Sequence, residues 1–208
     1  MNKLYGLLLC GGRSSRMGQD KARLMLDGQS LLQRGLALLA QAGCQQVFAG
    51  GDYPDVPAIA DLPRWQGRGP LAGIASALIQ QPDALWLILP VDMPGITAAV
   101  LQRFLCQASQ SLRTGEQSGM AVADSQFPLL LQGERALPVL EQLLESPEGR
   151  MASVGALIRA LQLPLLAPGT LIADPQQQQL LLCNTNTPEE WHHFRQEHGL
   201  LPTRLDCN

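Results

Sequence analysis

Residues 4–21 read LYGLLLCGGRSSRMGQDK, an apolar run that breaks into a glycine pair and then into a polar, basic stretch. The apolar run predicts a buried strand, and Gly11 and Gly12 predict a loop at its end. Without a Cβ, glycine lets backbone N–H groups approach a ligand closely and makes φ above 0° accessible. Arg16 and Lys21 add positive charge where a polyphosphate would lie. The stretch therefore predicts a phosphate-binding loop after the first strand.

The spacing excludes two common phosphate loops. The P-loop of NTPases needs four residues between its glycines and then Lys-Ser or Lys-Thr, whereas five residues separate Gly12 from Gly18, and Gln19 follows. The dinucleotide fingerprint needs Gly-x-Gly-x-x-Gly, but the glycine pair here is followed by no further glycine until Gly18. The stretch therefore matches neither of these two loops.

Charge and cysteine content narrow the class of partner. The chain of 208 residues has a formal net charge of −3, which does not suit a general nucleic-acid binder. Four of its 15 basic residues fall within residues 13–23, so the positive charge is local and indicates a small anionic partner. No apolar run approaches the ~20 residues that cross a bilayer, and the five cysteines are scattered without a Cys-x-x-Cys pair. We expect a cytoplasmic protein with no nucleic-acid or membrane partner.

Strands and helices alternate along the chain. In the first half we expect strands at 4–10, 47–49, 56–60 and 84–89, and helices after Ser30 as far as Gly43, over 70–78 and from Thr97. In the less regular second half we expect strands at 120–123, 127–131 and 180–184, and helices over 134–144, 153–161 and 188–197. The alternation predicts a single α/β domain with three layers, a mostly parallel sheet and right-handed crossovers. The second-half strand pair at 120–131 is expected to form a smaller lobe that faces the cleft.

Ligands of such sheets bind beyond the carboxyl ends of the strands. Gly11, Gly50, Asp61 and Asp92 are expected to meet there, although they are far apart in the sequence. Asp92 follows a buried strand and stands between two prolines, which places its carboxylate rigidly. A carboxylate opposite a triphosphate suits Mg²⁺, which binds hard oxygen ligands and commonly takes one or two from the protein. We therefore expect Mg²⁺ at Asp92, with a cap of the following helix or an Asx-turn as the alternative.

Residues 9–21 resemble the signature of the molybdenum cofactor guanylyltransferases, Leu-Ala-Gly-Gly-x-Ser-x-Arg-Met-Gly-x-Asp-Lys, with Cys10 in place of the alanine. Relatives that activate sugar phosphates usually carry Gly-x-Gly-Thr-Arg-Leu. Those that activate methylerythritol phosphate, or that make the cytidine form of the cofactor, usually carry Ala-Ala-Gly. The glycine pair followed by Asp-Lys is therefore typical of the guanine branch. The resemblance implies a Rossmann-like nucleotidyltransferase fold of the GT-A-like type.

The resemblance also implies roles for individual residues. The residues implied to bind GTP are Leu9, Cys10, Gly11, Gly12, Arg16, Lys21, Asp61 and Asp92. Arg16, Lys21 and Asp92 are implied to be catalytic, and Asp92 to bind Mg²⁺. Gly50 departs from the family, which commonly has an asparagine there that contacts the nucleotide. Arg64 and Arg68 lie in a loop near Asp61, where a substrate contact and solvated surface charge are both open.

Residues 184–190, NTNTPEE, resemble the family's Asn-x-Asn-Thr-Pro-Glu element, which lies toward the pterin side of the cleft in relatives. Thr187 and Glu190 have the spacing of a helix capping box, so local structure explains both. Capping does not require Asn184 or Asn186, and these two are the candidates for contact with the pterin. The nearby histidines at 192, 193 and 198 are interpreted as surface residues, because no acidic or cysteine partner stands at ligand spacing.

The resemblance implies an enzyme that transfers GMP from GTP to the terminal phosphate of molybdopterin and releases pyrophosphate. Residues 1–110 would hold the nucleotide and 111–199 the pterin substrate, with 200–208 as a tail. Other proteins of molybdenum cofactor biosynthesis or molybdoenzyme precursors would be transient partners. One alternative is a related nucleotidyltransferase that uses CTP or another small phosphorylated substrate. A second is a nucleotide-binding protein without catalysis, which would release no pyrophosphate.

Overall fold

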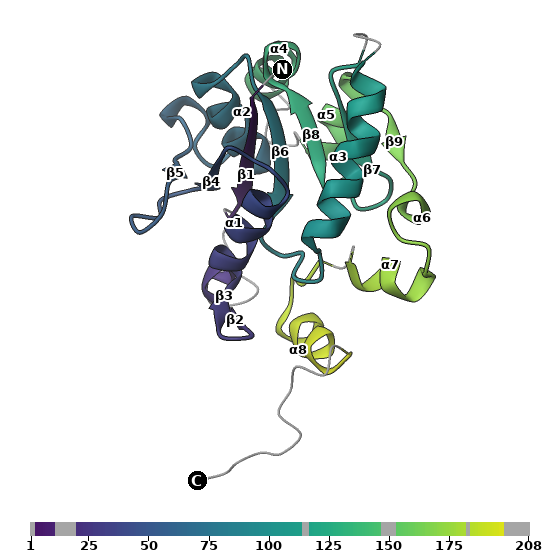
Figure 1. Cartoon of the computed structure of the whole chain (residues 1–208). Coiled ribbons are helices and arrows are strands. Elements are labelled where there is room, and N and C mark those ends of the chain that lie inside the picture. The colour runs from purple at the N-terminus through teal and green to yellow at the C-terminus, as the bar shows by residue number, and fades with distance from the viewer. Residues whose placement is uncertain (1–2, 11–19, 114–116, 147–152, 182–183, 198–208) are drawn as a thin grey trace.

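A seven-stranded sheet forms the centre of the computed structural model, which describes residues 3–10, 20–113, 117–146, 153–181 and 184–197. The strand order is β5-β4-β1-β6-β8-β7-β9 (Figure 1). The strands are β1 (Leu4–Leu9), β4 (Gln46–Gly50), β5 (Ala58–Ile59), β6 (Leu85–Pro90), β7 (Gly119–Val122), β8 (Leu129–Gln132) and β9 (Leu165–Leu166). β8 runs antiparallel to both of its neighbours, and the other pairs are parallel. The carboxyl ends of the remaining six strands therefore share one edge.

Helices cover both faces of this sheet. On the face toward the viewer in Figure 1 lie α1 (Leu31–Gln41) and α3 (Ala98–Leu112), and on the other lie α2 (Pro70–Gln80), α4 (Gly133–Glu145) and α5 (Val154–Ala160). The short helices α6 (Pro168–Leu171), α7 (Pro175–Leu181) and α8 (Pro188–Glu197) follow β9. Two 3₁₀ turns, η1 (Lys21–Arg23) and η2 (Pro63–Trp65), and a hairpin of β2 (Met25–Leu26) and β3 (Gln29–Ser30) complete the elements. None of the helices in the described part of the chain is long and apolar enough to cross a membrane.

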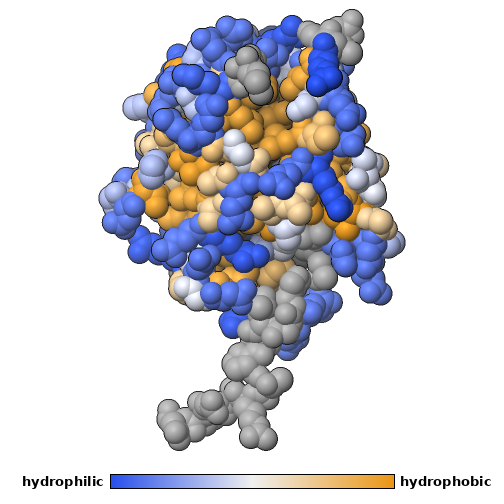
Figure 2. All heavy atoms as spheres, viewed as in Figure 1, coloured by the Kyte–Doolittle hydropathy of each residue, from blue (hydrophilic) through white to orange (hydrophobic). Residues whose placement is uncertain are grey.

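The core has two halves because successive side chains of a strand point to opposite faces of the sheet. On β1, Leu8 packs in the half that contains α1 and α3, whereas Leu7 and Leu9 pack in the half that contains α2, α4 and α5. The central strands β1 and β6 are consequently apolar on both faces, as expected for a covered parallel sheet. Figure 2 shows apolar residues between the hydrophilic surfaces of the front helices.

Helix α1 fits closely against the first strand. It begins with the predicted cap at Ser30, whose Oγ accepts a hydrogen bond from the Gln33 N–H while the Gln33 side chain accepts one from the Ser30 N–H. A Cβ added at Gly35 would lie 2.5 Å from Leu8 Cδ1, so glycine permits the close approach of α1 to β1. This packing supports the strand that precedes the predicted phosphate-binding residues.

The predicted fold class, a three-layer and mostly parallel α/β fold, is confirmed. The expected strand at 56–60 is limited to Ala58–Ile59, and the expected loop that carries Arg64 and Arg68 contains η2 with a buried Trp65. These differences are small, because the first half of the chain carries regular signals of strand, turn and helix.

Two predictions for the second half were wrong. The strand pair β7 and β8 does not form a separate lobe, because β8 pairs with β6 and extends the central sheet. The strand expected at 180–184 is replaced at its start by helix α7, which begins where the Asp174 side chain accepts a hydrogen bond from the Gln176 N–H. A short apolar run cannot by itself distinguish strand from helix. Residues 182 and 183 lie outside the described residues, and the two-residue strand β9 was not predicted.

Candidate functional site

The carboxyl ends of the central strands gather the residues predicted to bind nucleotide. Leu9, the last residue of β1, pairs in register with Gly50 of β4 on one side and Pro90 of β6 on the other. The carbonyl oxygen of Leu9 accepts a hydrogen bond of 3.0 Å from the N–H of Val91, just beyond β6. Asp92 follows at once. The rigid sheet thus fixes the backbone that carries Asp92, as the sequence predicted.

Lys21 joins this edge to the C-terminal segment. Its Nζ lies 3.3 Å from Asp92 Oδ2 and donates a hydrogen bond of 2.7 Å to Asn186 Oδ1. The side chains of Lys21 and Asp92 are only 14% and 20% exposed. Three residues spread over most of the sequence therefore meet in one partly buried polar cluster, which we call the Lys21 cluster. It combines a cation, a carboxylate and an amide, the groups that a metal-bound polyphosphate needs.

The backbone before α8 is fastened to the same place. The Thr185 N–H donates a hydrogen bond of 2.9 Å to the carbonyl oxygen of Asp92, and Thr185 is 1% exposed. The Glu190 carboxylate accepts hydrogen bonds from the N–H groups of Asn186 and Thr187, and the Glu190 N–H donates to Thr187 Oγ1. The predicted capping box is thus present, and Glu190 also holds the backbone of Asn186, whose side chain contacts Lys21.

Asp20 supports Lys21 from the preceding position. Its carboxylate caps η1 by accepting a hydrogen bond of 3.0 Å from the Ala22 N–H, and it also accepts a hydrogen bond from the hydroxyl of Tyr53. Arg23 Nε lies 3.6 Å from the same carboxylate. Sequence reasoning did not single out Tyr53. The signal available was the Gly50-Gly51 pair, which marks a turn at the end of β4 and places Tyr53 near the carboxyl edge of the sheet.

Cys10, the departure from the family signature, is buried. Its Sγ lies 3.4 Å from the Leu8 carbonyl oxygen. Burial, with a smaller contribution from the negative charge of Asp20, raises the pKa of the thiol to about 12. The side chain of Leu9 is also buried in the core. Any ligand contact at these two positions would therefore come from backbone groups.

Three of the predicted residues, Gly11, Gly12 and Arg16, lie outside the described residues. The predicted roles of these residues in nucleotide binding and catalysis stay predictions. The described residues that flank them, Cys10 and Asp20, both lie at the carboxyl edge of the sheet near Tyr53. The residues predicted to follow them in the site, Lys21 and Asp92, are in contact.

Asp61 lies at the same edge but against a different helix. A Cβ built at Gly73, in the first turns of α2, would lie 3.4 Å from Asp61 Oδ1. The next residue, Leu62, donates its N–H to Ser76 Oγ, which in turn donates to the Ala72 carbonyl oxygen. These bonds fix the segment after β5 onto α2. Burial raises the pKa of the Asp61 carboxyl, because desolvation disfavours its charged form.

Arg64 and Arg68 contact α4. The Arg64 guanidinium lies 3.0 Å from Glu141 Oε1 and 4.0 Å from the centroid of the Trp65 ring. Arg68 donates a hydrogen bond of 3.1 Å to the Leu144 carbonyl oxygen. The sequence left a substrate contact and solvated surface charge open for these two residues. Their contacts indicate a third role, a structural one, since both guanidinium groups connect the loop to α4.

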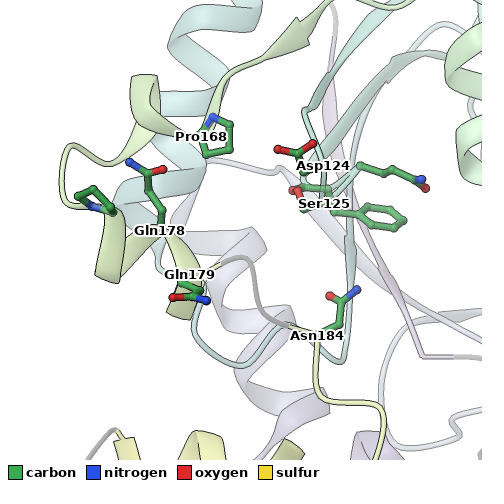
Figure 3. Close-up of a pocket in the computed structure, with 9 residues that line it drawn as sticks. Asp124, Ser125, Pro168, Gln178, Gln179 and Asn184 are labelled. Atoms are coloured by element: carbon green, nitrogen blue, oxygen red, sulfur yellow. The ribbon is translucent and has the colours of Figure 1, made fainter.

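A pocket of about 730 Å³ adjoins the C-terminal segment (Figure 3). The turn between β7 and β8 forms one side, and α6 and α7 form the other. Its lining residues are Asp124, Ser125, Gln126, Phe127, Pro168, Pro175, Gln178, Gln179 and Asn184. Figure 3 shows Asn184 directed into this space from the segment before α8. The pocket offers amide, hydroxyl and carboxylate groups beside an aromatic ring and two prolines.

The turn that lines this pocket has an unusual backbone. Asp124 and Gln126 both have φ of 65°, in the left-handed region that residues other than glycine seldom adopt. Hydrogen bonds from the Gln126 N–H to the Val122 carbonyl and from Ser125 Oγ to the Phe127 carbonyl maintain it. Strained backbone of this kind concentrates at ligand sites. The turn fixes three polar side chains at the pocket, none of which the sequence pattern had identified.

The two asparagines predicted from the C-terminal element therefore lie in two different places. Asn184 lines the pocket, whereas Asn186 accepts the hydrogen bond from Lys21. His193 is 70% exposed on α8, in agreement with its interpretation as a surface residue, but an acidic partner does stand within one turn, because Glu197 Oε1 lies 3.2 Å from His193 Nε2. Within the described ranges, no group of three or more His, Cys, Asp or Glu side chains is arranged to hold a metal ion.

Comparison with known proteins gives a consistent family. The family model of the MobA-like NTP transferase domain matches residues 6–162. The chain is 36% identical over 193 residues to a molybdenum cofactor guanylyltransferase of Xanthomonas euvesicatoria pv. vesicatoria, covering 92% of this chain and 94% of that one. It is 33% identical over 205 residues to a probable molybdenum cofactor guanylyltransferase of Opitutus terrae, covering 94% and 96% of the two chains.

Solved structures agree on the fold. The crystal structure of molybdopterin-guanine dinucleotide biosynthesis protein A from Archaeoglobus fulgidus has a TM-score of 0.72 and 20% identity, with 95% of this chain and all of that chain covered. A 4-diphosphocytidyl-2C-methyl-D-erythritol synthase has a TM-score of 0.61 and 12% identity, with 94% and 98% covered. From the matched residues, the relatives and the shared architecture together, the chain belongs to the family of MobA-like NTP transferases.

Proposed function

We propose that this protein transfers GMP from GTP to the terminal phosphate of molybdopterin, which forms the guanine dinucleotide form of the molybdenum cofactor. The observation that carries the proposal is the Lys21 cluster, in which Lys21, Asp92 and Asn186 meet at the carboxyl edge of a nucleotidyltransferase sheet. The names of the relatives from Xanthomonas euvesicatoria and Opitutus terrae support the same reaction.

On the nucleotide side, the residues act by position and charge. Lys21 and, as the resemblance implies, Arg16 would neutralise the phosphates of GTP. An oxygen of the acceptor phosphate attacks the α-phosphorus, and the bond between the α-phosphorus and the oxygen bridging to the β-phosphate breaks. Pyrophosphate leaves with that bonding pair. Catalysis then depends on orientation and on electrostatic stabilisation of the transferring phosphoryl group, without a covalent intermediate on the protein.

The described residues fit a magnesium ion that is held jointly with the nucleotide. Asp92 presents a hard carboxylate oxygen that is one-fifth exposed, with the amide oxygen of Asn186 in the same cluster. Because Mg²⁺ commonly takes one or two protein carboxylates and completes its shell with phosphate and water, a cage of several side chains is unnecessary. When bound, the ion would neutralise phosphate charge, and Asp92 would hold it.

The pocket beside α7 supports a place for the acceptor. Its amide groups at Gln178, Gln179 and Asn184 can exchange hydrogen bonds with the polar edges of a pterin, and Phe127 offers an aromatic surface. Asn184 connects this pocket to the Lys21 cluster through the two residues that follow it in the chain. The second half of the chain would thus bind the pterin substrate, and the first half the nucleotide.

A cytoplasmic setting for this reaction is part of the same proposal and rests on the sequence, in which the five cysteines are scattered without a Cys-x-x-Cys pair. Transient contacts with other proteins of molybdenum cofactor biosynthesis, or with molybdoenzyme precursors, belong to the same proposal, because its product must be handed on.

Nucleotide binding provides the first test. The purified protein is titrated calorimetrically with GTP, CTP, ATP and UTP in the presence of Mg²⁺, and the preferred nucleotide is repeated with Asp92→Ala. Asp83→Ala, at an exposed position outside the cluster, is the matched control. Selective binding of GTP that weakens with Asp92→Ala and persists with Asp83→Ala supports the proposal. Preference for CTP would instead favour the related enzyme that forms the cytidine cofactor, and absence of binding to all four would refute a nucleotidyltransferase.

A further inference from the structure

Tyr53 contacts Asp20, the residue that precedes Lys21, although Tyr53 lies in the loop after β4 and Asp20 lies at the start of η1. It follows β4, and its hydroxyl lies 3.3 Å from Oδ1 and 3.2 Å from Oδ2 of Asp20, to which it donates a hydrogen bond. The ring is partly buried against the core half that contains α1 and α3. The phenol thus reaches across the carboxyl edge of the sheet from β4 to the start of η1.

The backbone before Tyr53 is shaped to allow this contact. Gly51 has φ of 124°, a conformation that a side chain rarely adopts. A Cβ at Gly51 would also lie 3.2 Å from Cε2 of the Tyr53 ring. The Gly51 N–H donates to the Ile59 carbonyl oxygen and keeps this conformation tied to β5. The glycine turn therefore directs the tyrosine ring toward Asp20.

Asp20 transmits the contact to Lys21. Its Oδ1 accepts the hydrogen bond from the Ala22 N–H that starts η1, so the orientation of this carboxylate sets the orientation of the turn. Lys21 is the first residue of η1, and its Nζ reaches Asp92 and Asn186. A carboxylate held on one side by a backbone N–H and on the other by a phenol is restricted in rotation. Lys21 consequently leaves the turn along a defined direction.

The groups around the phenol favour its neutral, donating form. Burial, the neighbouring Cys10 and the Asp20 carboxylate raise the pKa of Tyr53 above its usual range, outweighing the opposing effect of Arg23. The hydrogen bond to Asp20 is therefore retained over the pH range in which a nucleotidyltransferase would be assayed. Because its acceptor is a carboxylate, this bond is stronger than one between two neutral groups.

We propose that Tyr53 is a positioning residue for nucleotidyl transfer, which holds Lys21 toward the phosphates of the nucleotide by fixing the Asp20 carboxylate. This inference rests on the proposed function and adds Tyr53 to the residues that act in that reaction. Tyr53 acts through Asp20 and Lys21, and it differs from a core residue in that its hydroxyl, rather than its ring, carries the effect.

The test compares Tyr53→Phe with Tyr5→Phe. Both variants lose one hydroxyl and keep the ring, but Tyr5 lies near the amino end of β1, packed against Trp86 and Phe48. For Tyr53→Phe we expect kcat/KM for GTP to fall about tenfold, the loss typical of one hydrogen bond to a charged group. KM for the molybdopterin acceptor and the Tm should stay close to their original values. Tyr5→Phe should leave kcat/KM for GTP unchanged.

A double-mutant cycle checks the route through Asp20. If Tyr53 acts on Lys21 by holding Asp20, Tyr53→Phe should have little further effect on GTP affinity once Asp20→Asn is present. Additive losses would overturn the inference, and so would a normal kcat/KM for GTP in Tyr53→Phe or a lower Tm with no change in GTP binding. Calorimetric titration with GTP serves as a second readout. Original protein that binds GTP but transfers no GMP would refute the proposed function, whereas the binding comparison would still test Tyr53.

Discussion

Lys21→Met removes the cation that joins the nucleotide side of the site to the C-terminal segment. Nζ of Lys21 lies 3.3 Å from Asp92 Oδ2 and 2.7 Å from Asn186 Oδ1. Methionine keeps most of the aliphatic stem, so the substitution isolates the loss of the ammonium group. The substitution leaves the Asp92 carboxylate, which is 20% exposed, without its cation, and the Asn186 amide oxygen without its donor.

The magnitude follows from these contacts. A hydrogen bond to a charged group contributes about 1.5–3 kcal/mol, but both groups here retain some access to water, which reduces the loss. We expect the free energy of unfolding to fall by about 2 kcal/mol, which lowers Tm by roughly 4–8 °C in a chain of this length. Turnover should fall much further, by about 10²–10³-fold, because a positioned charge acts on the transition state.

The assay combines thermal unfolding with the rate of pyrophosphate release from GTP in the presence of molybdopterin. Lys3→Met is the matched control, since Lys3 is exposed at the start of β1 and the substitution is chemically the same. The control should keep both Tm and turnover. Normal turnover in Lys21→Met would refute the reasoning. So would a decrease in turnover that matches the decrease in the fraction of folded protein.

Three further predictions concern stability and reactivity. Gly119→Ala should destabilise the fold by about 3 kcal/mol or more in chemical denaturation, because a Cβ there would lie 2.0 Å from the backbone oxygen of Leu130, which cannot rotate away. Asp61→Asn should raise Tm at neutral pH while weakening GTP binding. Burial raises the pKa of Asp61 in the folded state, so the native protein loses stability as pH rises above the usual aspartate pKa. Asp61→Asn has no carboxyl to ionise, so this part of the pH dependence of stability should disappear. Alkylation of the native protein at pH 8, followed by peptide mass spectrometry, should modify exposed Cys106 well before Cys10, whose pKa burial raises to about 12.

Much of the first half could be predicted from the sequence because its signals are local. The apolar run of β1, the cap at Ser30 and the proline at the start of α2 each specify an element without reference to distant residues. The placement of Asp92 at the carboxyl edge followed from the topology of parallel strands. The sequence predicted that Asp92 and Lys21 belong to the same site, but not that they are in direct contact. The hydrogen bond from Lys21 to Asn186 was not predicted either.

The second half could not be predicted as well because its structure depends on tertiary pairing. The two-residue strand β9 has no pattern of its own and exists through its pairing with β7. The apolar residues at the end of α7 fit strand and helix equally until the cap at Asp174 is seen. Tyr53 was overlooked for the same reason: its role depends on Asp20, 33 residues away, and no local motif marks the contact.

The transfer reaction itself tests the central claim most directly. Purified protein is incubated with Mg²⁺, molybdopterin and either GTP or CTP, and the pterin dinucleotide and pyrophosphate are quantified by mass spectrometry and a coupled phosphate assay. The account predicts equimolar guanine dinucleotide and pyrophosphate with GTP, and far less product with CTP. Cytidine dinucleotide as the main product, or nucleotide binding without any pyrophosphate, would contradict it.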